Sequence, residues 1–175
     1  MSGEEEVEVD QIQVNISECF VYQIPPLRTS EGHRAEDWQL ESPLFTGALR
    51  VYQRGDSLRV IVYRVPPISL QPTDESPYSI FAESLIHISP SERDLLRFVD
   101  GVVDSSRYFV LKIQDPNSDR SAYIGVGFRE RETAFEFKNC LNDYIRYINR
   151  VEQAKEMKKV ISQNKSSMLI CLLSV

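Results

Sequence analysis

The stretch that decides the fold runs from residue 105 to residue 150 and reads SSRYFVLKIQDPNSDRSAYIGVGFRERETAFEFKNCLNDYIRYINR. As far as Phe128, apolar and polar residues alternate, which is the period of a strand with one buried face. The turn-forming run 115–119 divides this alternation into two strands, 107–114 and 121–128. Beyond Phe128 the apolar spacing changes to about 3.6 residues. The stretch therefore predicts a β-hairpin followed by a long amphipathic helix.

The predicted helix carries apolar residues at three- and four-residue intervals, at Ala134, Phe137, Leu141, Tyr144, Ile148 and Val151. No proline or glycine interrupts residues 129–160, so this helix can lie across a sheet. The stripe is lost over 155–165, where we expect fraying. Residues 168–175 are nearly all apolar but far too few to span a membrane. Residues 168–175 fit three alternatives: a splice-variant or read-through end, a packed last strand, or a weak hydrophobic ligand motif.

Two glycines in the second strand and one tryptophan upstream bear on packing. Gly125 and Gly127 fall on the face opposite Ile124 and Val126, where another group can approach the backbone. Trp38 is the one large apolar residue in the polar stretch 27–45. Large aromatic residues are mostly buried, so we expect Trp38 to plug the core.

The chain before the hairpin also reads as β structure. Residues 7–16 alternate with one slip, and 19–24 form a strand candidate that Pro25-Pro26 ends. Residues 46–52 and 57–64 flank the tight turn at Gly55 and predict a second hairpin. Taken with the later hairpin, these segments predict a β-rich domain closed by one helix.

Residues 65–97 are the least regular part of the chain. Several prolines break them into a variable loop, with a strand candidate at 78–86. Residues 89–97 fit one short helix, with Ser89 or Ser91 as the N-cap. Residues 98–103 then predict a short strand.

The composition limits the class of protein. The 175 residues carry a net charge of −6, which argues against nucleic-acid binding and general affinity for anionic membranes, although it permits a local basic patch. Three widely spaced cysteines predict reduced, mostly buried thiols. The N-terminus has no basic and apolar signal, so we expect a soluble intracellular protein. A monomer is also expected. The predicted organisation is an acidic tail over 1–15, which can add an edge strand, one domain over 16–152 and a helix extension with tail over 153–175.

Catalysis finds no support in the sequence. The two histidines, His33 and His87, stand in polar, loop-like surroundings. No nucleophile elbow, zinc-binding helix motif or phosphate-binding loop is present, and Gly125-Val-Gly127 lacks the third glycine of a dinucleotide fingerprint. We therefore predict a binding module with no enzymatic activity, no cofactor and no metal.

Binding has a candidate surface at the junction between the second strand and the helix, marked by Arg129 and Arg131. The neighbouring segments add Arg107, Lys112 and Arg120. If the strands pair, these cations can converge on one rim, which suits an acidic or phosphorylated peptide because arginine binds such groups bidentately. Nearby aromatic residues can provide or accept apolar anchors: Tyr108, Tyr123, Phe135 and Phe137. The alternative is that the cations are solvated and the phenylalanines belong to the core.

Several segments resemble the NECAP family of adaptin-ear-binding coat-associated proteins. They are 21–26 (VYQIPP), 34–38 (RAEDW), 46–50 (TGALR), 104–115 (DSSRYFVLKIQD), 120–128 (RSAYIGVGF), Arg131 and 134–137 (AFEF). They occur in order over about residues 16–150. The resemblance implies a pleckstrin-homology-like fold, in which about seven antiparallel strands form a sandwich or barrel capped by a C-terminal helix.

The resemblance also implies a function in endocytosis. The family domain binds Phe-x-x-Phe-type peptides of coat proteins and the plasma-membrane clathrin adaptor complex, with a preference for the phosphorylated, open form, which it can return to an inactive state. It implies a cytoplasmic protein, peripheral on clathrin-coated vesicles and coated pits, that meets the membrane only through the coat. Carried over by position, the binding residues are Arg131 first, then Ser105, Ser106 and Arg107, with Lys112, Arg120 and Phe135 as weaker candidates.

The chain also departs from the family pattern. Residues 66–97 look longer and differently composed than the family loop, and no family match is seen from about Lys155. The Trp-x-x-Phe motif that often ends the family is absent from these residues, so adaptin-ear binding through that motif is not expected. The fold also permits phosphoinositide binding by the first hairpin, which offers only Arg50, Arg54 and Arg59.

Overall fold

The computed structural model describes residues 8–64, 79–89, 94–115 and 117–174. Within them the chain forms strands, two short 3₁₀ helices (η) and one long α-helix. In chain order these are β1 (Gln11–Tyr22), η1 (Ala35–Asp37), β2 (Phe45–Arg54), β3 (Ser57–Arg64), β4 (Ser79–His87), η2 (Leu95–Arg97), β5 (Val99–Gly101), β6 (Tyr108–Gln114), β7 (Ser121–Gly127) and α1 (Arg131–Leu173).

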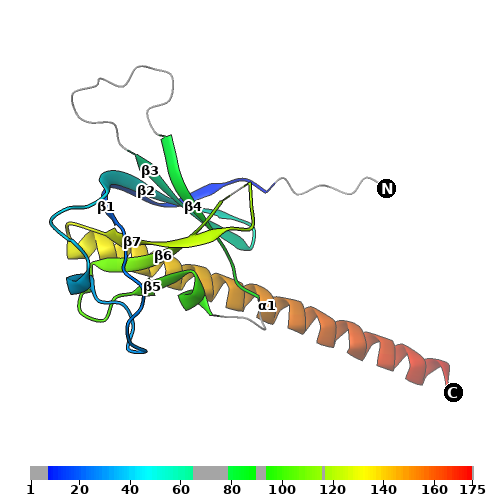
Figure 1. The fold of residues 1–175 in the computed structure, drawn as a ribbon. Helices are drawn as coiled ribbons and strands as arrows, with labels where there is room; N and C mark the ends of the chain where they lie inside the picture. The colour runs from blue at the N-terminus through cyan, green and yellow to red at the C-terminus, as the bar shows by residue number, and fades with distance from the viewer. Residues whose placement is uncertain (1–7, 65–78, 90–93, 116, 175) are drawn as a thin grey trace.

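The strands form one antiparallel sheet that closes into a barrel. Their order among the described residues is β4-β3-β2-β1-β7-β6-β5. A further pairing between β4 and β6, with Glu83 opposite Gln114, closes the ring, and β5 lies outside it on the edge of β6. Helix α1 runs along the barrel and covers one side of it (Figure 1). This arrangement confirms the expected pleckstrin-homology-like fold.

Strand β1 is one bulged strand where the sequence predicted two separate segments. Its pairing with β2 shifts register between Ile12 and Val14 and again between Ile16 and Cys19. A bulge adds one unpaired residue and exchanges the two faces of a strand. The slip in the alternation of residues 7–16, between Val9 and Ile12, precedes both bulges, and the second bulge lies where the sequence predicted a break between two segments.

The barrel interior is filled from β2, β3 and α1. Leu49, Val51 and Leu58 have no exposed surface, and neither do Val60 and Val62. The predicted helix stripe faces this interior, with Phe137 and Tyr144 each 1% exposed. At the end of the barrel where α1 begins, the ring of Phe137 lies 5.2 Å from that of Phe109 and 5.5 Å from that of Phe128. This packing fixes the first turns of α1 against β6.

A second, smaller apolar cluster lies apart from the interior. Trp38 is 5% exposed, as expected, but it belongs to this cluster and packs with Tyr22 and Tyr108. The two glycines of β7 provide the room, since Cβ atoms built there would meet Trp38 at Gly125 and Tyr108 at Gly127. The prediction that a group approaches the backbone at these glycines is confirmed.

The region between β3 and β6 follows the prediction in part. Strand β4 confirms the candidate at 78–86, whereas the predicted loop at 65–78 and residues 90–93, with Ser91, lie outside the described residues. The predicted helix over 89–97 is wrong in extent, because only η2 is helical there. The side chain of Asp94 accepts a hydrogen bond from the backbone N–H of Leu96 at 3.1 Å. The extended backbone of β5, from Val99, ends this turn.

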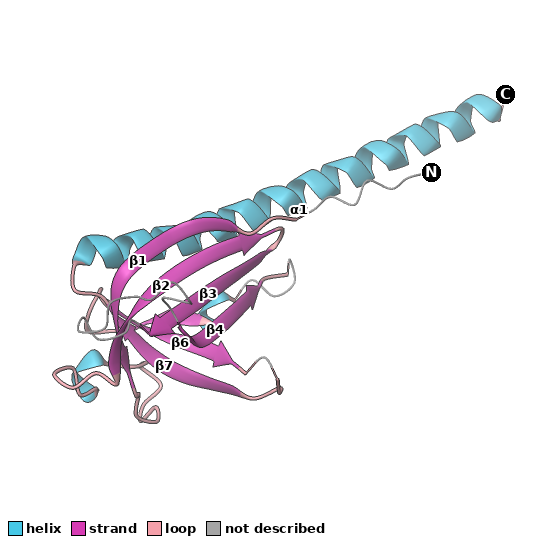
Figure 2. Cartoon of the chain, turned by 90° about the horizontal axis from the view of Figure 1, so that it is seen from above, coloured by secondary structure: helices cyan, strands magenta, loops and turns pink. Residues whose placement is uncertain are grey.

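Helix α1 is longer than the sequence predicted. It continues to Leu173 without a break, so the expected fraying over 155–165 is wrong, and so is a packed last strand after residue 168. Every residue from Gln153 to Ser174 is exposed. Figures 1 and 2 show this part, called here the helix extension (residues 153–173), standing clear of the barrel. Among the described residues, no helix has the length and apolar character needed to cross a membrane.

Candidate functional site

A groove with a volume of about 960 Å³ lies between the first turns of α1 and the segment formed by η2 and β5. The helix wall consists of Arg131, Phe135, Lys138, Asn142 and Ile145. These residues repeat at intervals of four and three, so they form one continuous line along the helix. The line lies beside the core stripe, and it extends for about 21 Å at 1.5 Å per residue.

The floor and the opposite wall of the groove are largely apolar. Phe109, Ala134 and Leu141 are buried and belong to the barrel interior, which makes the floor rigid. Leu95 and Leu96 of η2 stand on the opposite wall. A large apolar side chain is exposed on each wall, since Phe135 is 63% and Leu96 65% accessible to solvent. Exposed apolar residues facing one another across a groove are typical of a protein-binding site.

The charges of the groove lie at its margins. Arg131 and Lys138 bring positive charge from the helix, where Glu132 adds a negative charge next to Arg131, and Asp94 and Asp100 bring negative charge from the opposite wall. Ser105 and Ser106 border the groove near the start of α1. The Oγ of Ser105 accepts a hydrogen bond from the N–H of Arg107 at 3.3 Å, whereas the Ser106 side chain is exposed. One end of the groove therefore offers a guanidinium and two hydroxyl groups to a ligand.

The two arginines at the strand-to-helix junction have different surroundings. Arg129 pairs with Glu18 and lies over the ring of Phe20, 5.3 Å from its centroid. The hydrogen bond from Arg129 holds the pKa of Glu18 below its ordinary value. Arg131 is exposed and forms no ion pair or side-chain hydrogen bond with any described residue. Of the two, Arg131 is the one whose charge is available to a ligand.

The predicted site residues fall into separate places. Arg131, Ser105, Ser106 and Phe135 line the groove together. Arg107 lies outside it, donating a hydrogen bond from Nη1 to the carbonyl of Arg129 at 3.0 Å.

Lys112 and Arg120 border a different, polar depression at the turn between β6 and β7. The expected convergence of all these cations on one rim is therefore wrong. In the antiparallel hairpin, Tyr108 pairs with Gly127 at one end, and the turn with Arg120 is at the other end, about 20 Å away.

The residues of the opposite wall and most of those of the helix wall were not predicted from the sequence. The helix wall continues from Arg131 and Phe135 at helical spacing, through Lys138, Asn142 and Ile145. This spacing is present in the sequence, but the adjacent core stripe is the stronger pattern and was the one recognised. Leu95 and Leu96 carry no periodic signal, and only the fold brings them to the helix. Among the described residues, no three His, Cys, Asp or Glu side chains are placed to hold a metal ion.

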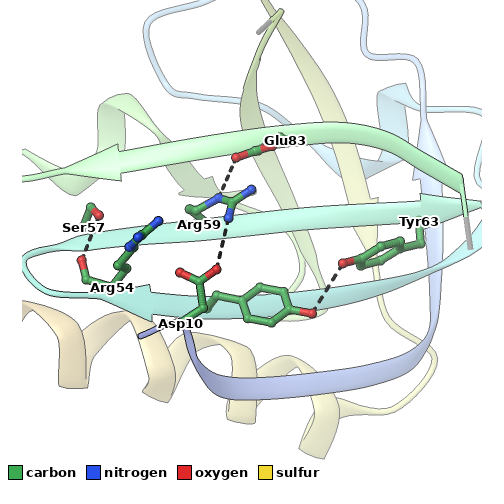
Figure 3. Close-up of polar contacts among 7 residues, drawn as sticks. Asp10, Arg54, Ser57, Arg59, Tyr63 and Glu83 are labelled. Atoms are coloured by element: carbon green, nitrogen blue, oxygen red, sulfur yellow. Dashed lines mark hydrogen bonds and ion pairs between the residues drawn. The ribbon is translucent and has the colours of Figure 1, made fainter. Parts of the chain in front are cut away.

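The first hairpin does not present free positive charge at Arg59 or Arg50. Nε of Arg59 donates to Glu83 at 2.7 Å, and its Nη1 lies 3.4 Å from the carboxylate of Asp10, as Figure 3 shows. Arg50 donates to the Asn15 side chain at 3.0 Å and lies over the ring of Tyr63. These contacts engage two of the three arginines that this hairpin was expected to offer to a phosphoinositide headgroup.

The fold and the groove define a pleckstrin-homology-like domain with a groove beside its capping helix. The chain belongs to the family described as "Protein of unknown function (DUF1681)", whose model matches residues 9–170 and so continues beyond Lys155, where the sequence motifs showed no match. It is also similar to proteins named adaptin ear-binding coat-associated protein. Adaptin ear-binding coat-associated protein 2 of Rattus norvegicus is 36% identical over 146 residues, which are 83% of this chain and 49% of that protein.

Adaptin ear-binding coat-associated protein 1 of Homo sapiens is 35% identical over 154 residues, which are 88% of this chain and 49% of that protein. These matches confirm the resemblance that the sequence motifs indicated, and the chain spans about half the length of the relatives it matches. A solved structure of the Ran-binding domain of Nup2 from Ashbya gossypii covers 79% of this chain, with 6% identity and a TM-score of 0.47. That likeness is too distant to bear on function.

Proposed function

We propose that this chain is a non-catalytic module of clathrin-coated vesicle formation that binds coat proteins through the groove between α1 and β5. The names of its relatives support the general role, because they describe coat-associated, adaptin-ear-binding proteins. The proposed ligands are Phe-x-x-Phe-type peptides of coat accessory proteins and the plasma-membrane clathrin adaptor complex. The protein would then be cytoplasmic and peripheral on coated pits and vesicles.

The observation that carries the proposal is the pairing of an apolar groove with one available arginine at its end. About 21 Å of groove length accommodates roughly six extended residues, so two phenylalanines three positions apart fit within it. Phe135 and Leu96 offer exposed apolar contacts for such aromatic anchors. Arg131 is placed to bind an acidic or phosphorylated group that flanks the motif.

The test measures binding of a fluorescent Phe-x-x-Phe peptide by anisotropy, beside a control peptide with both phenylalanines replaced by alanine. We expect Phe135→Ala to raise the Kd at least 10-fold, the size typical of a binding hot spot. Tyr123→Ala is the matched control, because Tyr123 is 54% exposed but lies outside the groove. Equal affinity of Phe135→Ala and the parent chain would remove the groove from the proposal.

A second arm tests the adaptor complex. Arg131→Ala should abolish pull-down of the complex from cytosol while the thermal midpoint stays unchanged. Arg146→Ala provides the comparison, since Arg146 lies on the same helix but pairs with Asp143 at 3.0 Å. Retained pull-down by Arg131→Ala would contradict the role given to that residue.

A further inference from the structure

The helix extension has its own amphipathic surface, distinct from the face that packs on the barrel. At 100° per residue, Met157, Ile161, Met168 and Leu172 fall within an arc of about 60°. This arc is rotated by about 125° from the mean direction of the buried core residues between Phe137 and Ile148. The four side chains are between 54% and 73% exposed. The extension therefore has an apolar stripe that no described part of the chain covers.

The charge of the extension is opposite to that of the whole protein. Residues 153–173 contain four lysines and one glutamate, a net charge of +3, whereas the chain carries −6. Lys158 and Lys165 directly flank the apolar stripe, Lys155 lies about 130° from its centre, and Lys159 lies on the opposite face of the helix. Glu156 lies on the other side of the helix. This is the pattern of a basic amphipathic helix, in which lysine side chains extend from the edge of an apolar face.

The last turns of the extension are apolar on every side. Residues 168–173 read MLICLL, which covers more than one full turn without a polar residue. Ile170 and Leu173 are 66% and 84% exposed although they lie away from the stripe. A protein groove covers one face of a helix, whereas lipid can cover an apolar segment on all sides.

We propose that the helix extension binds the surface of an anionic lipid bilayer, with residues 168–173 inserted and the lysines at the headgroup level. The complementary charge supports lipid over a second copy of this chain. Two extensions packed along this stripe would bring Lys158 and Lys165 toward lysines of the other copy, with one glutamate per helix to offset them. The inference is independent of the groove, and it revises the expectation that the protein meets the membrane only through the coat.

The experiment is co-sedimentation of the full chain with phosphatidylcholine vesicles and with vesicles that also contain phosphatidylserine. We expect binding to the anionic vesicles that weakens as salt is added, because salt screens the lysine charges. Replacing Lys158, Lys159 and Lys165 together by glutamine should lower the partition coefficient about 100-fold, at roughly fivefold per lysine. Leu169→Glu combined with Leu172→Glu should abolish binding. Arg54→Gln, on the first hairpin, should leave it unchanged.

Cys171 gives a direct readout of insertion. It is exposed, whereas Cys19 and Cys140 are buried, and burial raises the pKa of these two thiols to about 12 and about 11. A maleimide dye sensitive to polarity therefore labels Cys171 selectively, and its emission should shift to the blue with anionic vesicles. Three outcomes would overturn the proposal: no anionic binding, loss of binding in Arg54→Gln but not in the leucine variant, or self-association in light scattering without vesicle binding.

Discussion

The ring of Trp38 occupies the space where a side chain at Gly125 would stand. A Cβ atom built on Gly125 would lie 2.7 Å from Cζ3 of Trp38 and 3.0 Å from Cγ2 of Ile24. Trp38 is 5% exposed and packs with Tyr22 and Tyr108, and the half-buried Ile24 packs against the same cluster. The missing side chain in β7 is therefore what allows the segment with η1 to pack on the barrel.

Gly125→Ala should lower the free energy of unfolding by about 1–3 kcal/mol, because the added methyl group overpacks this contact. Gly101→Ala is the matched control, since a Cβ there meets no atom within 4 Å. Its effect should be within about 0.5 kcal/mol or slightly stabilising. Urea unfolding followed by tryptophan fluorescence measures both. An equal loss in the two variants would mean that backbone freedom, and not contact with Trp38, requires the glycine.

Asp104 also holds the segment that contains η1, through two hydrogen bonds to its backbone. One carboxylate oxygen accepts the N–H of Ala35 at 2.7 Å and the other accepts that of Glu36 at 2.9 Å. Burial raises the pKa of Asp104, but the backbone hydrogen bonds and the charge of Arg34 outweigh it, so the net pKa lies below the ordinary value. The stabilisation is thus present at neutral pH and is lost as the pH falls through the folded-state pKa.

Asp104→Ala should cost about 1 kcal/mol of unfolding free energy at pH 7, as the loss of a side-chain cap does. The difference from the parent chain should shrink as the pH falls below about 4, because the unfolded parent chain then takes up this proton before the folded chain does. Asp104→Asn keeps one acceptor oxygen and should give an intermediate value. Urea titrations from pH 3 to pH 7 provide the measurement, and a difference that does not change with pH would contradict the role of the ionised carboxylate.

Tyr144 joins α1 to the far end of the barrel. Its hydroxyl donates to the carbonyl of Asp56 at 2.7 Å and accepts the N–H of Ile88 at 3.4 Å. Burial raises the pKa of Tyr144 to about 12. Between pH 10 and pH 12 the unfolded chain releases this proton and the folded chain keeps it, so stability falls as the pH rises.

Tyr144→Phe should lower stability at pH 7 by about 1–2 kcal/mol, because the partner groups lose their hydrogen bonds. It should also flatten the decline between pH 10 and pH 12 by about 1.4 kcal/mol per pH unit, the value of one proton. Cys19 and Cys140 begin the decline from about pH 9 in both proteins, since burial raises the pKa of each thiol. Parallel pH profiles for the two proteins would show that Tyr144 does not titrate in this range.

The sequence predicted those parts of the fold that one periodic segment determines. Alternation identified β6 and β7, and the spacing of Phe137 and Tyr144 identified the packed half of α1. The closure of the barrel was not predictable, because β4 and β6 meet at a single pair, Glu83 and Gln114, that no local pattern marks. The fraying prediction failed because loss of the core stripe was equated with loss of helix, although residues 153–173 contain no glycine or proline to end it.

The candidate site was predictable for its helix side alone. Arg131 and Phe135 are neighbours on one helix face, so sequence spacing brings them together. Leu96 faces them from 39 positions before Phe135, and only the packing of η2 and β5 places it there. Lys112 and Arg120 were grouped with Arg131 because strand pairing was assumed to gather them, whereas an antiparallel hairpin separates its two ends.

A comparison of Phe135 with Phe137 tests which residues of α1 bind a peptide and which stabilise the fold. Phe137 is 1% exposed and contacts Phe109 and Phe128, so Phe137→Ala should lower the free energy of unfolding by about 3–5 kcal/mol. Phe135 is 63% exposed on the groove wall, so Phe135→Ala should change it by less than about 0.5 kcal/mol while weakening peptide binding. Urea unfolding and peptide anisotropy on the same preparations separate the two effects. A large loss of stability in Phe135→Ala would assign that ring to the fold and leave the groove without its main aromatic contact.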